Sequence, residues 1–173
     1  MVWSTLAQHL LNKPSPPRAA GQSTAAALAE RLNNLSNEKL GRSLAIRHVD
    51  AGSCNGCELE LRAIQNMVYD LPQYGLSFTP SPRHADILLI TGVAARNMGE
   101  ALRQARAAMP DPVFTIAVGD CAVDGGVFKG SPAITGGADS ILTVDLMISG
   151  CPPTPGQIID GLLSLIEAHT GGK

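Results

Sequence analysis

Hydrophobic and polar positions follow two alternating patterns from residue 44 onward. Short apolar runs of strand length alternate with longer stretches whose composition favours helix. The strand-like runs are 44–49, 76–79, 86–91, 113–118 and 140–148. The helical stretches are 58–70, 99–109 and 154–169. Strands and helices that alternate at this spacing predict an α/β fold, a flavodoxin-like doubly wound parallel sheet with helices on both faces.

The first 43 residues follow a different pattern. Trp3, Leu6 and Leu10 have the spacing of one helix face, and Pro14, Pro16 and Pro17 end that helix. A second helical stretch covers 24–35. We therefore predict two units, an N-terminal helical extension with a proline-rich linker over 1–43 and the sheet domain over 44–173. The apolar face of the first helix predicts contact with protein or with a membrane surface.

Composition and charge narrow the class of protein. Charged residues make up 16% of the chain, below the ~25% of an average domain, which indicates that part of the surface faces other proteins. The formal net charge of −2 excludes a generic nucleic-acid binder, which carries a dense basic face. No apolar run approaches the ~20 residues of a membrane span, and no export signal begins the chain. We expect a cytoplasmic protein.

The four cysteines follow predicted strands. Cys54 and Cys57 come after the first strand, Cys121 follows 113–118, and Cys151 follows the last strand. The carboxyl ends of parallel strands share one edge of the sheet, where ligands bind in such folds. Cysteines of cytoplasmic proteins are more often ligands or catalysts than disulfides. The sequence therefore predicts that four thiols from three loops meet at one edge.

The spacing of the cysteines favours an iron–sulfur cluster. Structural zinc sites use two close pairs of ligands, whereas only Cys54 and Cys57 form a local pair here. A [4Fe–4S] cluster accepts ligands from separate loops, and Cys-Pro, as in Cys151-Pro152, recurs among its ligands. A redox-active Cys54–Cys57 pair would leave the other two cysteines without a role. A zinc-binding interaction module and four free buried cysteines remain the alternatives.

Four segments carry a resemblance to a known family: 52–60 (GSCNGCELE), 80–92, 119–128 and 150–155. They resemble the small, iron–sulfur subunit of group 4 energy-converting, membrane-bound [NiFe] hydrogenases of the formate hydrogenlyase type. That subunit is homologous to the 20 kDa subunit of respiratory complex I. The resemblance covers about residues 44–168 and implies that Cys54, Cys57, Cys121 and Cys151 bind one [4Fe–4S] cluster.

The same resemblance implies a role and a set of partners. The cluster would lie nearest to the Ni–Fe site of a large catalytic subunit and exchange electrons with a ferredoxin-like iron–sulfur subunit, in support of H2 evolution or oxidation. Membrane-arm subunits would hold the complex on the inner face of the cell membrane. The chain would belong to an oxidoreductase without itself carrying catalytic residues. The similar complex I subunits, which pass electrons to quinone, have two adjacent cysteines where this chain has Cys54 and Cys57, so the spacing favours the hydrogenase branch.

Two glutamates follow Cys57 closely. Glu60 is interpreted either as a carboxylate favoured near a helix N-terminus or as a proton-relay or interface residue. Glu58 has the first interpretation with less support for the second. Asp120 and Asp124 flank Cys121, and negative charge beside a cluster would lower its reduction potential.

Three other residues have a structural and a functional interpretation. Arg83 is expected either to pair with the charge of the cluster or of a partner, or to lie at a strand edge on the surface. His48 and His84 are expected to be structural histidines. No G-x-G-x-x-G, Walker or G-x-S-x-G pattern occurs, so we predict no nucleotide site and no hydrolase.

Overall fold

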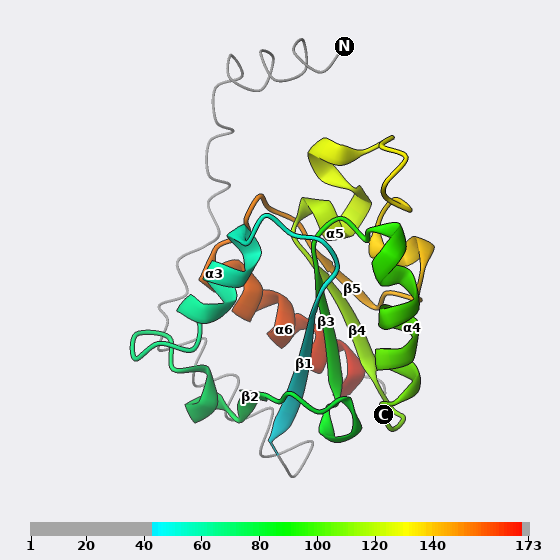
Figure 1. Ribbon diagram of the computed structural model, residues 1–173. Coiled ribbons are helices and arrows are strands. Elements are labelled where there is room, and N and C mark those ends of the chain that lie inside the picture. Colours follow the sequence, from blue (N-terminus) through cyan, green and yellow to red (C-terminus); the bar gives the residue numbers. More distant parts are fainter. Residues whose placement is uncertain (1–42, 171–173) are drawn as a thin grey trace, which may run out of the picture.

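The computed structural model describes residues 43–170 of the chain. The helices that the sequence predicts at 3–11 and 24–35 therefore lie outside the described residues, and the N-terminal extension stays a prediction. The described part is one sheet with helices packed against it (Figure 1). Among these residues, no helix combines the length and the apolarity that crossing a membrane requires.

The sheet has five strands, and all of them run parallel. They are β1 (Leu44–Asp50), β2 (Leu76–Phe78), β3 (Ile87–Thr91), β4 (Phe114–Val118) and β5 (Leu146–Ile148). Their order across the sheet is β2-β1-β3-β4-β5, with each neighbouring pair parallel. This is the strand order of flavodoxin-like sheets, so the predicted fold class is confirmed.

Helices cover both faces of the sheet and form two separate cores. They are α3 (Gly56–Ala63), α4 (Gly99–Ala107), α5 (Asp120–Asp124) and α6 (Pro155–Thr170). On one face, Leu61 of α3 and Ile158 of α6 pack with the strands, and on the other face Leu102 of α4 and Ala122 of α5 do so. Figure 1 shows α6 crossing behind the strands while α4 runs along the opposite side.

Strand β3 occupies the centre of both cores. All five of its residues are buried, and its side chains alternate between the two sides. Ile87 and Leu89 belong to the core beneath α3 and α6, whereas Leu88 and Ile90 belong to the core beneath α4. A strand buried on both faces has a continuous apolar sequence, which explains the run DILLIT at 86–91.

Two element boundaries differ from the sequence prediction by several residues, and one short helix was not predicted. The strand predicted at 140–148 begins only at Leu146, because the Asp145 carboxylate accepts a hydrogen bond from the Thr115 N–H at 2.7 Å in place of a backbone partner. The helix predicted at 58–70 ends at Ala63, and the side chain of Asn66 then accepts hydrogen bonds from the N–H groups of Val68 and Tyr69 in a turn. The short helix α5 lies in a glycine-rich segment that carries no helical periodicity.

Two glycines of α6 allow a matched stability test. A Cβ atom at Gly161 would lie 2.5 Å from Ile148 Cδ1, whereas a Cβ atom at Gly156 would have no neighbour within 4 Å. Alanine in place of a helical glycine gains up to about 1 kcal/mol, and overpacking a core costs about 1–3 kcal/mol. In urea denaturation, we expect Gly156→Ala to raise the free energy of unfolding slightly and Gly161→Ala to lower it. Equal gains would contradict the close packing of α6 on β5.

Candidate metal centre

The four cysteines lie at the carboxyl edge of the sheet. Cys54 is in the loop between β1 and α3, and Cys57 is in the first turn of α3. Cys121 is in the first turn of α5, directly after β4, and Cys151 follows β5. This edge is the upper one in Figure 1. The topology therefore brings together the loops that the sequence analysis placed at one edge.

The thiols are close enough to influence one another electrostatically. Burial is the main cause that raises the pKa of Cys57 to about 12, and Glu58 and the other three cysteines add to the effect. Burial likewise raises the pKa of Cys121, with Cys151 and Cys54 contributing next. Burial, Asp120 and Cys54 raise the pKa of Cys151. Burial thus disfavours the thiolate form of Cys57, Cys121 and Cys151, and a bound metal would reverse this because it deprotonates its coordinating thiols.

Glycines leave room beside three of the sulfur atoms. Gly119 has a φ of +91°, and a Cβ atom there would lie 2.6 Å from Cys57 Sγ. Gly126 has a φ of +50°, and its Cβ would lie 3.2 Å from Cys121 Sγ. A Cβ at Gly56 would lie 3.5 Å from Cys54 Sγ. Soft sulfur donors, three of them with a glycine beside them, fit an iron–sulfur cluster, whose sulfurs are approached by backbone N–H groups.

Asp120 joins the loops that carry Cys121 and Cys151. Its backbone N–H donates to Gly150 O at 2.9 Å, and its carboxylate accepts a hydrogen bond from the Gly150 N–H at 2.8 Å. Asp120 therefore has a structural role beside its negative charge. The charge of Asp124 is balanced differently, because it forms an ion pair with Lys129 at 2.9 Å that lowers the pKa of the aspartate.

An apolar hollow of about 290 Å³ lies between the Cys54 and Cys121 loops. Its walls include Val93, Ile134 and Phe128. Three large apolar residues that follow the cysteines closely in the chain are exposed, and they are called the apolar rim below. Leu59 is 55% exposed, Val127 62% and Phe128 51%. Large apolar side chains gathered at one edge are typical of a surface that another protein covers.

Glu58 has a larger part in the site than its sequence context indicates. Both of its carboxylate oxygens accept hydrogen bonds, one from Thr91 Oγ1 and the other from Ser53 Oγ at 2.8 Å. Because Thr91 donates its proton to Glu58, its oxygen accepts from His48 Nε2 at 2.9 Å. This network joins the Cys54–Cys57 loop to β1 and β3. A signal existed in the sequence, since Thr91 is a polar residue at the end of an otherwise apolar buried strand.

The network predicts an acid-sensitive fold. Burial is the main cause that lowers the pKa of His48 from its ordinary value of 6.5, although Glu58 and Asp50 act in the opposite direction. The unfolded chain therefore binds a proton at a higher pH than the folded chain does, and stability falls as the pH drops below about 6.5. In urea denaturation between pH 5 and 8, acidification should lower the free energy of unfolding less in His48→Gln than in the unmodified chain. The exposed His84 is the control, and an identical pH dependence for His48→Gln and the unmodified chain would contradict the assignment.

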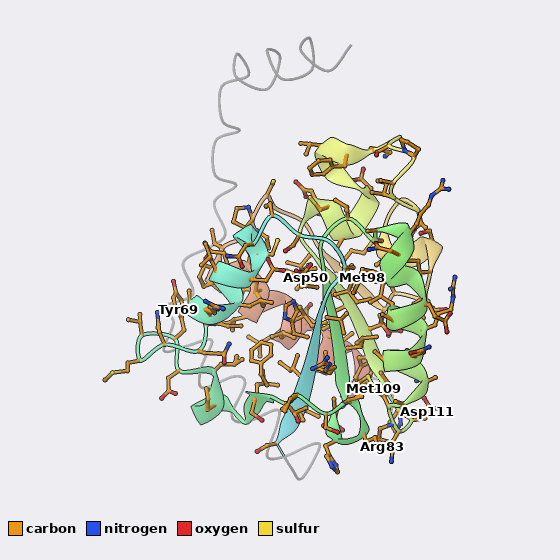
Figure 2. The ribbon with its side chains drawn as sticks, in the orientation of Figure 1. Asp50, Tyr69, Arg83, Met98, Met109 and Asp111 are labelled. Carbon is orange, nitrogen blue, oxygen red and sulfur yellow. The ribbon has the colours of Figure 1, made fainter. Side chains whose placement is uncertain are left out.

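Other residues singled out in the sequence lie apart from the cysteines. Arg83 and His84 belong to the turn Pro82–His84 before β3, at the amino edge of the sheet. Figure 2 shows Arg83 near the end of the sheet opposite to Asp50, which ends β1. The expectation that Arg83 pairs with the charge of a cluster is therefore wrong, because β3 separates the two edges. Glu60 is half-buried on α3 and forms no ion pair or side-chain hydrogen bond with the described residues.

In the part of the chain that the structure describes, no group of three His, Cys, Asp or Glu side chains is arranged to hold a single metal ion.

Comparison with known proteins places the chain. Residues 54–165 match the family described as the 20 kDa subunit of NADH ubiquinone oxidoreductase. The chain belongs to this family. The match begins at Cys54 and includes Cys57, Cys121 and Cys151. The family consists of subunits of oxidoreductases, as the resemblance in the four segments predicted.

Three similar proteins mark the range of the family. Formate hydrogenlyase subunit 7 of Escherichia coli is 42% identical over 133 residues, which are 75% of this chain and 52% of that protein. An NADH-quinone oxidoreductase subunit of Herpetosiphon aurantiacus is 42% identical over 64% of this chain and 62% of its own length. The chain thus spans between half and two thirds of these two curated relatives. A chain of an archaeal respiratory complex, the membrane-bound sulfane sulfur reductase, is 31% identical with a TM-score of 0.68, covering 83% of this chain and 78% of that one.

Proposed function

We propose that this chain is the electron-transfer subunit of a membrane-associated, [NiFe]-hydrogenase-like complex and holds one [4Fe–4S] cluster. Cys54, Cys57, Cys121 and Cys151 would be its ligands. The observation that carries the proposal is the placement of all four thiols of the chain at one sheet edge. When bound, the cluster supplies a one-electron carrier.

The geometry favours a cluster over zinc. Four sulfur ligands of a zinc ion each lie about 2.3 Å from one point, which requires the sulfurs to converge closely. Among the described residues, no three His, Cys, Asp or Glu side chains converge in this way, and Gly119 and Gly126 place no side chain beside Cys57 and Cys121. This is the reason for ranking the zinc-binding interaction module below the cluster.

The residues around the thiols would hold and shield the cluster. Glu58, fixed by Thr91 and Ser53, sets the position of the Cys54–Cys57 loop. Asp120 keeps the Cys121 and Cys151 loops together through its paired hydrogen bonds with Gly150. Glu60 remains a candidate proton-relay or interface residue.

The partners follow from the exposed rim and from the relatives. A large catalytic subunit of the [NiFe] type would cover the apolar rim formed by Leu59, Val127 and Phe128 and keep water from the cluster. A ferredoxin-like subunit would supply or remove electrons. Membrane-arm subunits would hold the complex on the inner face of the membrane. The formate hydrogenlyase and membrane-complex relatives support this assignment.

The second candidate is a complex I-like subunit that passes electrons to quinone. The family description and the NADH-quinone oxidoreductase relative support it. The Cys54-Asn55-Gly56-Cys57 spacing favours the hydrogenase branch, as the resemblance implies.

Isolation of the native complex distinguishes the two candidates. The chain is purified anaerobically with its partners through an affinity tag, and the large partner is sequenced. We expect two Cys-x-x-Cys pairs in that partner, bound nickel, and reduction of an artificial dye by H2. A partner without these cysteine pairs, in a complex that reduces quinone and does not consume H2, would favour the second candidate.

A further inference from the structure

A groove of about 410 Å³ lies between α3, β1 and the segment that follows β2, and it shares no lining residue with the apolar hollow described above. Arg47 of β1 and Arg62 of α3 contribute basic side chains to it. Leu61, Phe78 and Pro80 contribute apolar walls. The crevice outside the carboxyl ends of the strands is where open parallel sheets commonly bind ligands.

The guanidinium of Arg47 is only partly satisfied. Its Nη1 donates to Pro80 O at 2.8 Å, which fixes the side chain along the groove. Its Nε is enclosed and has no hydrogen-bond partner among the described residues. A buried donor without an acceptor costs about 1–3 kcal/mol, so such a group marks a place where an acceptor is missing. The guanidinium donors of Arg47 and Arg62 that remain accessible suit the oxygens of a carboxylate.

The other ionisable residues of the groove do not form ion pairs with Arg47 or Arg62, so both arginines can bind an anion. Glu58 is the acidic residue in its lining, and both of its oxygens already accept hydrogen bonds from Thr91 and Ser53. Burial lowers the pKa of His48, which favours its neutral form. Arg62 forms no ion pair with any residue that the structure describes.

We propose that this groove is a carboxylate-binding site, in which Arg47 and Arg62 hold the carboxylate and Leu61, Phe78 and Pro80 contact a short carbon body. The carboxylate belongs either to a small organic acid or to an acidic side chain of a bound protein, and the two share the same recognition chemistry. The groove borders the Cys54–Cys57 loop through Asn55 and Glu58 but includes none of the four cysteines in its lining. A carboxylate bound there is a different ligand from the cluster, so the proposal goes beyond the electron-transfer role and does not depend on it.

Isothermal titration calorimetry on the purified full chain at low salt tests the proposal. The probes are succinate, tetraglutamate peptide and inorganic phosphate. We expect saturable binding of at least one carboxylate probe at about millimolar affinity. Binding of succinate would point to a small organic acid, and binding of the peptide alone would point to a protein side chain. Binding of phosphate only, or of no probe, would overturn the proposal.

Three variants test whether carboxylate binding occurs in this groove. Arg62→Gln, at an exposed position, should weaken carboxylate binding by about tenfold, and Arg47→Lys should do the same because lysine lacks the paired donors. Arg103→Gln is the matched control, since Arg103 lies on α4 beside Glu100 at 3.6 Å, outside the groove. Equal affinity in Arg62→Gln and the unmodified chain would overturn the site. Circular dichroism confirms that each variant is folded, and iron analysis of the same samples tests the cluster proposal independently.

Discussion

Replacing Cys57 with alanine is expected to remove the iron–sulfur cluster from the chain. Cys57 is the thiol whose pKa is raised to about 12, chiefly by burial, and three other cysteines contribute to that rise. When one of the four thiolates of a [4Fe–4S] cluster is removed, one iron has no protein ligand. We expect the iron content of anaerobically purified Cys57→Ala to fall by more than about half, together with loss of the broad visible absorbance of a cluster.

The control for this variant is Ser131→Ala. Ser131 lines the same hollow as Cys54 and Cys121, and its Oγ only accepts a 3.3 Å hydrogen bond from the Ala133 N–H. It should keep the full iron and sulfide content. Equal iron in Cys57→Ala and Ser131→Ala, with an unchanged electron paramagnetic resonance signal after reduction, would remove Cys57 from the ligand set.

Gly119→Ala should be nearly as damaging, although it changes no ligand. The new Cβ would lie 2.6 Å from Cys57 Sγ, so either the sulfur or the loop must shift. The φ of +91° adds backbone strain of about 1–3 kcal/mol for a residue with a side chain. We expect a lower melting temperature and a reduced iron content per chain.

Gly130→Ala separates these two causes. Gly130 has a similar φ of +85°, but a Cβ there would meet nothing within 4 Å. It should lose stability through strain alone and retain its iron. If both variants lost stability equally and both retained iron, the close contact between Gly119 and Cys57 would not matter for the site.

The fold class was predictable because the central strands β3 and β4 are almost entirely buried. Apolar runs such as 86–91 mark strands without ambiguity, and their alternation with helices fixed the parallel, doubly wound class. The ends of elements were less predictable, because single side chains decide them. Asp145 replaces a backbone acceptor at the start of β5, and Asn66 forms the turn after α3.

The candidate site was predictable as far as topology controls it. Each cysteine follows a strand, so the shared edge of the sheet follows from strand order. Contacts between side chains that are distant in the sequence could not be predicted from strand order. Thr91 reaches Glu58 across 33 positions, and nothing in a local pattern reveals that pairing. The same reason accounts for Arg83, whose place before β3 puts it at the opposite edge.

The metal content and the redox behaviour of the full chain decide whether it carries electrons. The full chain is purified without oxygen, its iron, sulfide and zinc are quantified, and it is titrated with a reductant while electron paramagnetic resonance is recorded. A single [4Fe–4S] cluster predicts about four iron and four sulfide per chain and uptake of about one electron. Zinc at about one per chain, without iron or sulfide, would contradict the electron-transfer role and favour a structural module.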